Sequence, residues 1–243
     1  MHASSHTVQQ ARTNRRQVLD RQRILEVALD FVDRDGLDAL SMRKLGSLLG
    51  VEAMALYHYF PSKASLVDSL VGMVLARLAV PSVTATNDWA AVLRLVARSF
   101  RDLGAAHPNI FPLLATIGLD HPASPAPAEA VLGVLTRAGL STRDAFDAFV
   151  ALKSYVVGYT LWSIGNRCPG QCSAPDAAGV VVDVDPAAYP LLAELAGWLA
   201  ERRLDAQFEA GLDLLLAAIA ARVNTSAASP ARAGSRRPGP GCC

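Results

Sequence analysis

Apolar side chains recur every three or four residues along most of the chain, and this spacing is the strongest constraint on its fold. In residues 18–35, for example, Leu25, Ala28, Leu29 and Val32 fall on one stripe, with charged residues opposite. Such a stripe is typical of an amphipathic helix that packs against a core. The pattern therefore predicts an all-α fold.

Capping residues divide the chain into separate helices. Ser41 and Ser62 can accept hydrogen bonds at helix N-termini, and Gly36 and Gly50 can end helices in a left-handed conformation. We expect helices near residues 18–35, 41–49, 52–59, 62–78, 87–106, 108–117, 125–138, 142–166, 187–200 and 201–222. Residues 167–186 are rich in Gly, Pro, Ser and Asp and predict a long loop.

A change of composition after Pro81 predicts two domains. Charge becomes sparse there, and long segments rich in Ala, Leu and Val begin. We expect a basic flexible arm at 1–17, a smaller helical domain with its linking fourth helix at 18–80, a larger helical domain at 81–223 and a disordered tail at 224–243.

The high hydrophobic content, 51% of the residues, does not predict a membrane protein. The longest run without charge, Leu103–Leu119, is interrupted by prolines, and the next, Ser154–Asn166, is much shorter than the roughly 20 residues that span a bilayer. The N-terminal segment lacks the apolar core of a secretory signal, so we expect a cytoplasmic protein with no membrane partner.

The N-terminal segment is basic. The first 24 residues contain five arginines against Asp20 alone, which suits a polyanion such as nucleic acid. A solvated flexible tail is the alternative explanation. The four cysteines have no zinc-finger spacing, and we interpret them as incidental: Cys168, Cys172, Cys242 and Cys243.

Two short predicted helices, Ser41–Leu49 and Glu52–Tyr59, are joined by a tight turn at Gly50. Val51 and Leu56 are expected to pack against Leu45 and Leu48. This pattern is typical of a helix-turn-helix, whose second helix enters the DNA major groove. Two ordinary core helices with a tight loop are the alternative.

The letters around this turn are more specific than its spacing. Leu-Gly-Val at 49–51, followed by Ala-Leu-Tyr-His-Tyr-Phe-Pro-Ser-Lys at 55–63, closely resembles the tetracycline repressor (TetR) family of bacterial transcription regulators. The resemblance covers residues 20–80 strongly. It extends more weakly through Asp88-Trp89, Ser99-Phe100-Arg101 and 208–212, which look like the regulatory domain of the tetracycline repressors.

The resemblance implies roles for individual residues in DNA binding. Arg43 corresponds to a position that reads a guanine edge, and a guanidinium can bond guanine O6 and N7; a phosphate contact is its alternative. The positions implied to contact bases or phosphates are Arg43, Ala53, Met54, Ala55, Tyr57, His58, Tyr59 and Lys63. Tyr59 and Phe60 could instead be packing residues, which is our preferred interpretation of Phe60, and His58 could be an ordinary surface histidine.

Gly46 stands where the family usually has alanine. Glycine lowers helix propensity by about 1 kcal/mol but lets two helices approach closely.

The resemblance also implies a small-molecule effector and a homodimer bound to a palindromic DNA operator. The implied pocket residues are Phe100, His107, Phe111, Leu114, Tyr155, Tyr159, Trp162 and Asn166. Aromatic residues at helical spacing are more often core residues, which is the alternative for each of them. Leu114 and Val96 stand where tetracycline repressors have a metal-ligating His and an Asn. These departures disfavour a metal-chelated tetracycline, which stays as the alternative, and we expect a hydrophobic or aromatic effector with no metal or cofactor.

Dimer contacts are implied for the helices at 142–166 and 201–222. Their broad apolar faces carry Phe146, Phe149, Val150, Val157 and Leu161 on one helix, and Leu204, Phe208, Leu212 and Leu215 on the other. The same faces could fill the core of the monomer, and we expect both uses.

Two other functional classes remain as alternatives. A helical adaptor that has lost DNA binding is suggested by Gly46 and by the small side chains of Ala53 and Ala55. An all-helical enzyme is disfavoured, because Asp144 and Asp147 open a helix, where acidic residues are common. We expect a ligand-responsive repressor with no enzymatic activity.

Overall fold

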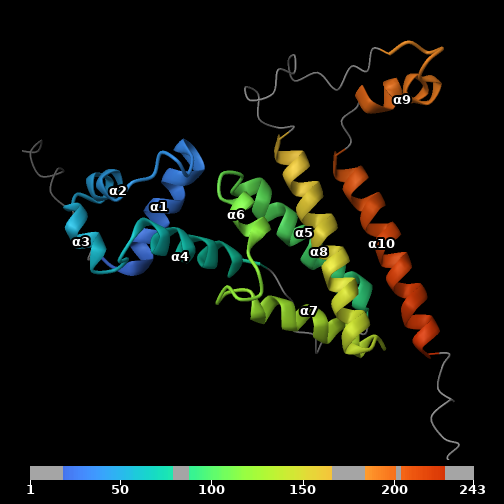
Figure 1. Cartoon of the computed structure of the whole chain (residues 1–243), viewed down its shortest axis with the longest axis horizontal. Coiled ribbons are helices and arrows are strands. Elements are labelled where there is room, and N and C mark those ends of the chain that lie inside the picture. Colours follow the sequence, from blue (N-terminus) through green and yellow to red (C-terminus); the bar gives the residue numbers. More distant parts are fainter. Residues whose placement is uncertain (1–18, 79–87, 166–183, 201–203, 228–243) are drawn as a thin grey trace, which may run out of the picture. The chain divides into compact units, whose positions relative to one another are not determined.

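The computed structural model describes residues 19–78, 88–165, 184–200 and 204–227, and within them it contains ten α-helices and no β-strand (Figure 1). In chain order the helices are α1 (Arg21–Asp35), α2 (Met42–Leu49), α3 (Ala53–Tyr57), α4 (Lys63–Leu75), α5 (Trp89–Ala106), α6 (Phe111–Thr116), α7 (Pro125–Arg137), α8 (Thr142–Gly165), α9 (Pro190–Ala200) and α10 (Leu204–Ala227). The all-α prediction is confirmed for this part of the chain.

The chain divides into two compact units, Met1–Met73 and Val74–Cys243. The division falls within α4, whereas the change in composition had placed it at Pro81. In the first unit, α1, α2, α3 and the beginning of α4 surround a small apolar core. Its fully buried side chains are Ile24, Ala28, Val32, Leu45, Leu56, Phe60, Leu66 and Leu70.

The helix ends of the first unit follow from local chemistry. Asp20, Ser41 and Ser62 each accept a hydrogen bond from the backbone N–H three residues later, at 2.7, 3.2 and 3.1 Å. Gly50 is left-handed, with φ 68°, and Gly36 has φ 84° with an extended ψ. The predicted caps at Ser41 and Ser62 and the predicted ends at both glycines are confirmed.

The second unit has its core where α5, α7, α8 and α10 pack together. The buried members of this core are Val92, Leu93, Val96, Ala97, Val131, Val134, Leu135, Leu140, Ala145, Ala148, Leu152, Val156, Phe208, Leu212, Leu216 and Ile219. Of the described helices, none has the length and apolar character to cross a bilayer.

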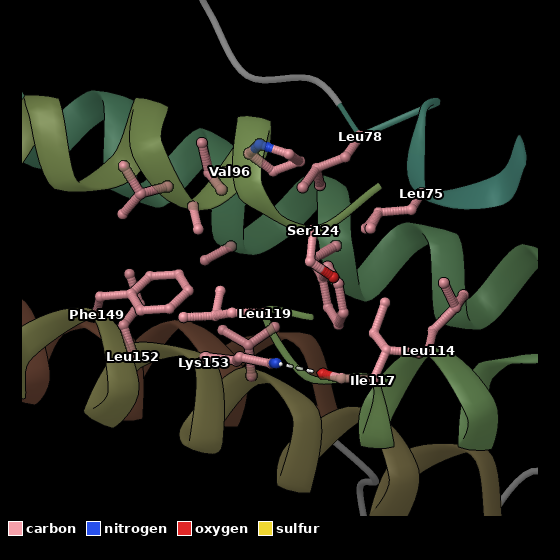
Figure 2. A pocket seen from close by; sticks show the side chains of 16 residues that line it. Leu75, Leu78, Val96, Leu114, Ile117, Leu119, Ser124, Phe149, Leu152 and Lys153 are labelled. Atoms are coloured by element: carbon pink, nitrogen blue, oxygen red, sulfur yellow. Dashed lines mark hydrogen bonds between the residues drawn. The ribbon is translucent and has the colours of Figure 1, made fainter. Parts of the chain in front are cut away.

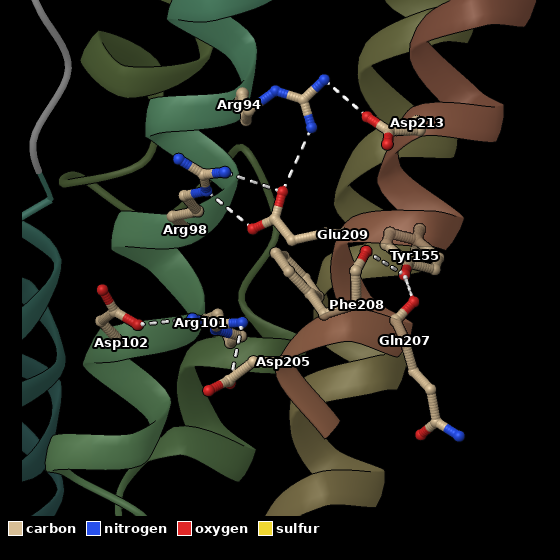
Figure 3. Close-up of polar contacts among 10 residues, drawn as sticks. All are labelled: Arg94, Arg98, Arg101, Asp102, Tyr155, Asp205, Gln207, Phe208, Glu209 and Asp213. Atoms are coloured by element: carbon tan, nitrogen blue, oxygen red, sulfur yellow. Dashed lines mark hydrogen bonds and ion pairs between the residues drawn. The ribbon is translucent and has the colours of Figure 1, made fainter. Parts of the chain in front are cut away.

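Arginines on α5 pair with carboxylates on α10 (Figure 3). Arg98 donates two hydrogen bonds to Glu209, at 2.7 and 2.9 Å. Arg94 bridges Glu209 and Asp213, at 3.1 and 2.6 Å. The hydrogen bond from Arg98 is the largest cause of a lowered pKa of Glu209, and the same contacts raise the pKa of both arginines. This cluster joins α5 to α10 at the surface of the core.

Two tyrosines on α8 face α10. The hydroxyl of Tyr155 donates to the carbonyl of Phe208 at 2.8 Å, and that of Tyr159 donates to the carbonyl of Leu204. The Tyr155 ring also stacks on Phe208, with centroids 5.7 Å apart. A Cβ at Gly211 would collide with the hydroxyl and ring of Tyr155, so α10 accepts this tyrosine only because residue 211 is glycine.

Several helix ends differ from prediction by a few residues. α4 stops at Leu75 because residues 77 and 78 continue as hydrogen-bonded turns, and α6 starts only at Phe111 because a turn from His107 precedes it. α10 continues to Ala227, past the expected start of the tail at 224, since its alanine-rich end sustains the helix. The basic arm at 1–17, Asn166, the four cysteines and most of the expected loop and tail lie outside the described residues.

Candidate functional sites

The helix-turn-helix is held together by a close approach at Gly46. A Cβ at this position would lie 2.8 Å from the carbonyl oxygen of Val51 and 3.2 Å from the nitrogen of Ala53. The carbonyl of Gly46 in turn accepts a hydrogen bond from the N–H of Val51 at 2.9 Å. The predicted role of Gly46 in close packing is confirmed, because the backbone at the start of α3 lies too near Gly46 to leave room for a Cβ.

The two helices present one face to solvent and one to the core. Leu45 and Leu56 are fully buried, as the predicted packing requires. Leu48 was expected to join them, but 50% of its surface is exposed. Half of Leu48 therefore lies outside the predicted contact.

The outer face of α3 is made of residues predicted to contact DNA. Met54 is 69% exposed and Tyr57 43% exposed, and His58, the last residue of this segment, is also exposed. Ala53 and Ala55 are half-buried on either side of Met54. Ala53, Met54 and Ala55 have apolar side chains, so the centre of this surface offers apolar contacts.

Two basic side chains flank this face. Arg43 on α2 is exposed, and only its backbone carbonyl is used, by the hydroxyl of Ser47 at 3.1 Å. Lys63, at the start of α4, is exposed and its Nζ donates to the carbonyl of Leu37 at 3.4 Å. Both side chains are therefore accessible to a polyanion, as the predicted DNA contacts require.

Tyr59 is used inside the unit. Its hydroxyl donates to the carbonyl of Leu19 at 2.6 Å, and its own carbonyl accepts from Arg21 at 2.8 Å. The guanidinium of Arg21 also lies 4.3 Å from the centroid of Phe60, which is fully buried. The alternative interpretation of Tyr59 and Phe60 as packing residues describes both positions.

The second unit encloses an apolar cavity bounded by α5, α6, α7 and α8, with the end of the α4 segment (Figure 2). About 680 Å³ is free of protein atoms, including the part that opens to solvent. A mostly apolar lining with a few polar groups is the usual form of a small-molecule site. The lining residues are Leu75, Leu78, Val96, Ala97, Phe100, Leu114, Ile117, Leu119, Ser124, Pro127, Ala128, Val131, Phe149, Leu152, Lys153 and Val156.

Of the eight predicted pocket residues, Phe100 and Leu114 line this cavity. Phe111 lies behind Phe100, with ring centroids 5.4 Å apart, and is fully buried. His107 ends α5 and lies 3.1 Å from a guanidinium nitrogen of Arg77. Phe111 therefore packs behind a lining residue, and neither Phe111 nor His107 forms the cavity surface.

The remaining predicted pocket residues lie elsewhere. Tyr155 and Tyr159 face α10, where burial is the largest cause of a raised pKa of Tyr155. Trp162 is 51% exposed and packs edge-on against Tyr159. Asn166 is outside the described residues. The cavity lies along a neighbouring stripe of α8, formed by Phe149, Leu152, Lys153 and Val156.

Lys153 and Ser124 are the lining residues with polar side chains that the sequence patterns missed. A signal for Lys153 was present, because it carries the only charge between Asp147 and Arg167 in an otherwise apolar helix. Ser124 carries no such signal. Across the described residues, no group of three or more His, Cys, Asp or Glu side chains gathers into a potential metal site.

Two family descriptions match this chain. "Bacterial regulatory proteins, tetR family" matches residues 24–70, and "Tetracyclin repressor-like, C-terminal domain" matches residues 81–223. The tetracycline repressor protein class A from transposon 1721 of Escherichia coli is 33% identical over 202 residues, which cover 82% of this chain and 89% of the relative. The HTH-type transcriptional repressor Rv1353c of Mycobacterium tuberculosis is 30% identical over 226 residues, covering 88% and 85%.

Solved structures resemble this chain over most of their length. ActR from Streptomyces coelicolor without ligand has a TM-score of 0.72 at 26% identity, covering 86% of this chain and 98% of ActR. ActR in complex with actinorhodin has a TM-score of 0.70 at 26% identity, covering 84% and 98%. A TetR variant from Acinetobacter baumannii in complex with minocycline has a TM-score of 0.61 at 27% identity, covering 84% and 98%.

Proposed function

Because this chain belongs to the TetR family of bacterial regulatory proteins, we propose that it is a transcriptional repressor released from DNA by a small molecule. The observation that carries the proposal is the presence of two sites in one chain. The first unit exposes the outer face of a helix-turn-helix, and the second encloses an apolar cavity.

In DNA binding, α3 enters the major groove, and α2 crosses the DNA backbone beside that groove. Arg43 bonds a guanine edge, and the small or apolar side chains of Ala53, Met54 and Ala55 contact thymine methyl groups. Phosphate contacts from Tyr57, His58 and Lys63 position the unit on the duplex. The hydroxyl of Tyr59 is engaged by Leu19, so we assign it to the support of this surface.

The effector is a hydrophobic or aromatic compound that fills the cavity. Fourteen of the sixteen lining residues have apolar side chains, and Phe100 and Phe149 offer aromatic contacts. The structures of ActR with actinorhodin and of A. baumannii TetR with minocycline support an effector at this level of generality. Leu114 and Val96 both line the cavity, where a metal chelate would require ligating side chains.

A homodimer supplies two recognition helices for a palindromic operator. Phe146, Val150 and Leu161 remain 41%, 43% and 37% exposed along α8, and Leu214 on α10 is 75% exposed. By contrast Phe208 and Leu212 are fully buried in the core of the unit. We assign the exposed set to the dimer interface, and sedimentation without DNA is expected to give a dimer; a monomer at micromolar concentration contradicts this assignment.

Effector and operator act on each other through the free energies of two states of the dimer. The effector shifts the equilibrium only by its difference in affinity between the DNA-binding and the non-binding state. By reciprocity, the operator weakens effector binding by the same factor. Because such a regulator acts on chromosomal DNA, its proposed location is the bacterial cytoplasm.

The test is fluorescence anisotropy with labelled duplexes from the region upstream of the protein's own gene. We expect a specific Kd of about 10⁻⁸ M or tighter at physiological salt, and at least a thousandfold weaker binding to a scrambled duplex. Hydrophobic aromatic compounds are then added to the complex, and one of them is expected to release the DNA. Equal, weak binding to both duplexes would instead favour a helical adaptor without operator recognition.

A further inference from the structure

The cavity in the second unit contains one charged side chain. Lys153 projects from α8 into a lining that is otherwise apolar except for Ser124, and the lining includes no Asp, Glu or His. Figure 2 shows the lysine reaching across the cavity wall toward the end of α6. A single cation in an apolar cavity imposes a charge preference on whatever binds there.

The Lys153 ammonium is only partly satisfied by the protein. It donates one hydrogen bond, to the backbone carbonyl of Ile117 at 3.1 Å, and it forms no ion pair with the carboxylates of the described residues. An ammonium has three N–H donors, so two remain for water or a ligand. Ser124 is similar, because its hydroxyl makes no capping hydrogen bond at the start of α7.

A ligand that fills the cavity removes water from these groups. A neutral apolar ligand leaves the ammonium desolvated and without new partners, which is unfavourable. A cationic ligand adds repulsion to that penalty. A ligand with an anionic group replaces the lost water by a charge-assisted hydrogen bond, which is stronger than a neutral one, especially in apolar surroundings.

We propose that the effector is an amphipathic acid: an aromatic or otherwise apolar body with one anionic group, such as a carboxylate or an ionised phenol, held by Lys153. The apolar body occupies the space beside Phe100 and Phe149, and Ser124 is available to a second polar group of the ligand. This inference rests on the proposed function of the cavity as the effector site and specifies the chemical class of the effector.

A matched pair of fluorescent probes tests the charge preference in the full-length protein. The anionic probe is 1-anilinonaphthalene-8-sulfonate, and the neutral one is N-phenyl-1-naphthylamine, which has the same aromatic body without the sulfonate. We expect the wild type to bind the anionic probe at least tenfold more tightly than the neutral one, because a hydrogen bond to a charged group is worth a factor of about ten or more.

Substitutions at Lys153 separate its charge from its bond to Ile117. K153M removes both, whereas K153Q removes the charge but keeps an N–H donor. Both variants are expected to lose the preference for the anionic probe while binding the neutral probe as well as the wild type does. K153R keeps the charge and should keep the preference. R143M removes an exposed cation from the same helix and is expected to change neither affinity.

A cavity-filling substitution localises the bound probes. Ala128 lines the cavity, so A128F should weaken both probes while the tryptophan-monitored unfolding transition is retained. If A128F leaves anionic binding unchanged, the charge preference arises elsewhere and the proposal is overturned. Equal affinities for the two probes in the wild type also overturn it, as does an equal loss of both in K153Q.

The operator assay distinguishes the two proposals. If a neutral aromatic compound releases the operator and acids of similar size do not, the repressor function stands and the amphipathic acid is rejected. If the protein binds no operator but retains the charge preference in its cavity, the proposed regulatory function fails while the chemical class of the ligand stands.

Discussion

The two units present their candidate binding residues in opposite ways. In the first unit, Met54 and Tyr57 project from one short helix, α3, whose inner residue Leu56 is fully buried, and the functional surface points outward. In the second unit, the candidate contacts line an internal space between four helices. A few residues that are close in sequence can form an outward surface. An internal surface forms only when segments that are distant in sequence pack together correctly.

The largest expected effect concerns the core of the second unit. Phe208 is fully buried, with the Tyr155 and Tyr159 rings 5.7 and 5.3 Å away, so F208A should lower the free energy of unfolding by about 3–5 kcal/mol. Urea unfolding followed by tryptophan fluorescence measures it, since all three tryptophans of the chain lie in this unit. L191A, at a 73% exposed position, is the control and should change stability by no more than about 0.5 kcal/mol.

A substitution in the first unit tests whether the two units unfold independently. G46V places a branched side chain against the backbone of Val51 and should destabilise the helix-turn-helix by about 1–3 kcal/mol. We expect operator binding to fall while probe binding and tryptophan-monitored unfolding are unchanged. G197V is the matched control, because a Cβ there meets no atom within 4 Å. A shifted tryptophan transition in G46V would show that the units unfold together.

Arg43 tests the outward surface itself. R43A should weaken binding to the cognate operator by about 1–3 kcal/mol and relax selectivity at one base pair, because a guanine contact is lost. Anisotropy with operators substituted at each position measures both effects. A uniform loss on all sequences would show that Arg43 contacts only phosphate. The side chain is exposed, so the unfolding transition should move by no more than about 0.5 kcal/mol.

The smallest expected effect is electrostatic. Arg98 and Arg94 hold the pKa of Glu209 below its ordinary value, so the stabilisation is complete above that value, about 4.3, and is lost as pH falls through the lowered pKa. At pH 7, E209Q should be less stable than the wild type by about 1 kcal/mol or less. The difference in stability between E209Q and the wild type should narrow in urea unfolding below pH 4. E194Q, at an exposed position on α9, is the control at pH 7 and should change stability by no more than about 0.5 kcal/mol. A difference for E209Q that is constant down to pH 3 would contradict the role of the ion pairs.

The outward site could be predicted from sequence because its determinants are local. Capping by Ser41 and Ser62 and the turn at Gly50 depend on a few consecutive residues, and the structure confirms them. The exposure of Leu48 and the hydrogen bond from the Tyr59 hydroxyl to Leu19 could not be predicted, because both are set by tertiary packing.

The internal site could be predicted only in part. Helical spacing identifies the stripes of α8 but does not say which neighbour each stripe contacts. Tyr155 and Tyr159 lie on the stripe that meets α10, and Lys153 lies on the adjacent stripe that meets the cavity. Phe100 and Leu114 were found because family resemblance supplied the missing tertiary information.

The collision that any side chain at residue 211 would have with Tyr155 restricts the order in which this protein can change. A side chain at residue 211 meets a tyrosine whose hydroxyl is bonded to the carbonyl of Phe208. Replacement of Tyr155 by a smaller residue removes the colliding atoms. The two positions are therefore coupled, and we expect a change at residue 211 to be tolerated better in a chain that has already lost the tyrosine.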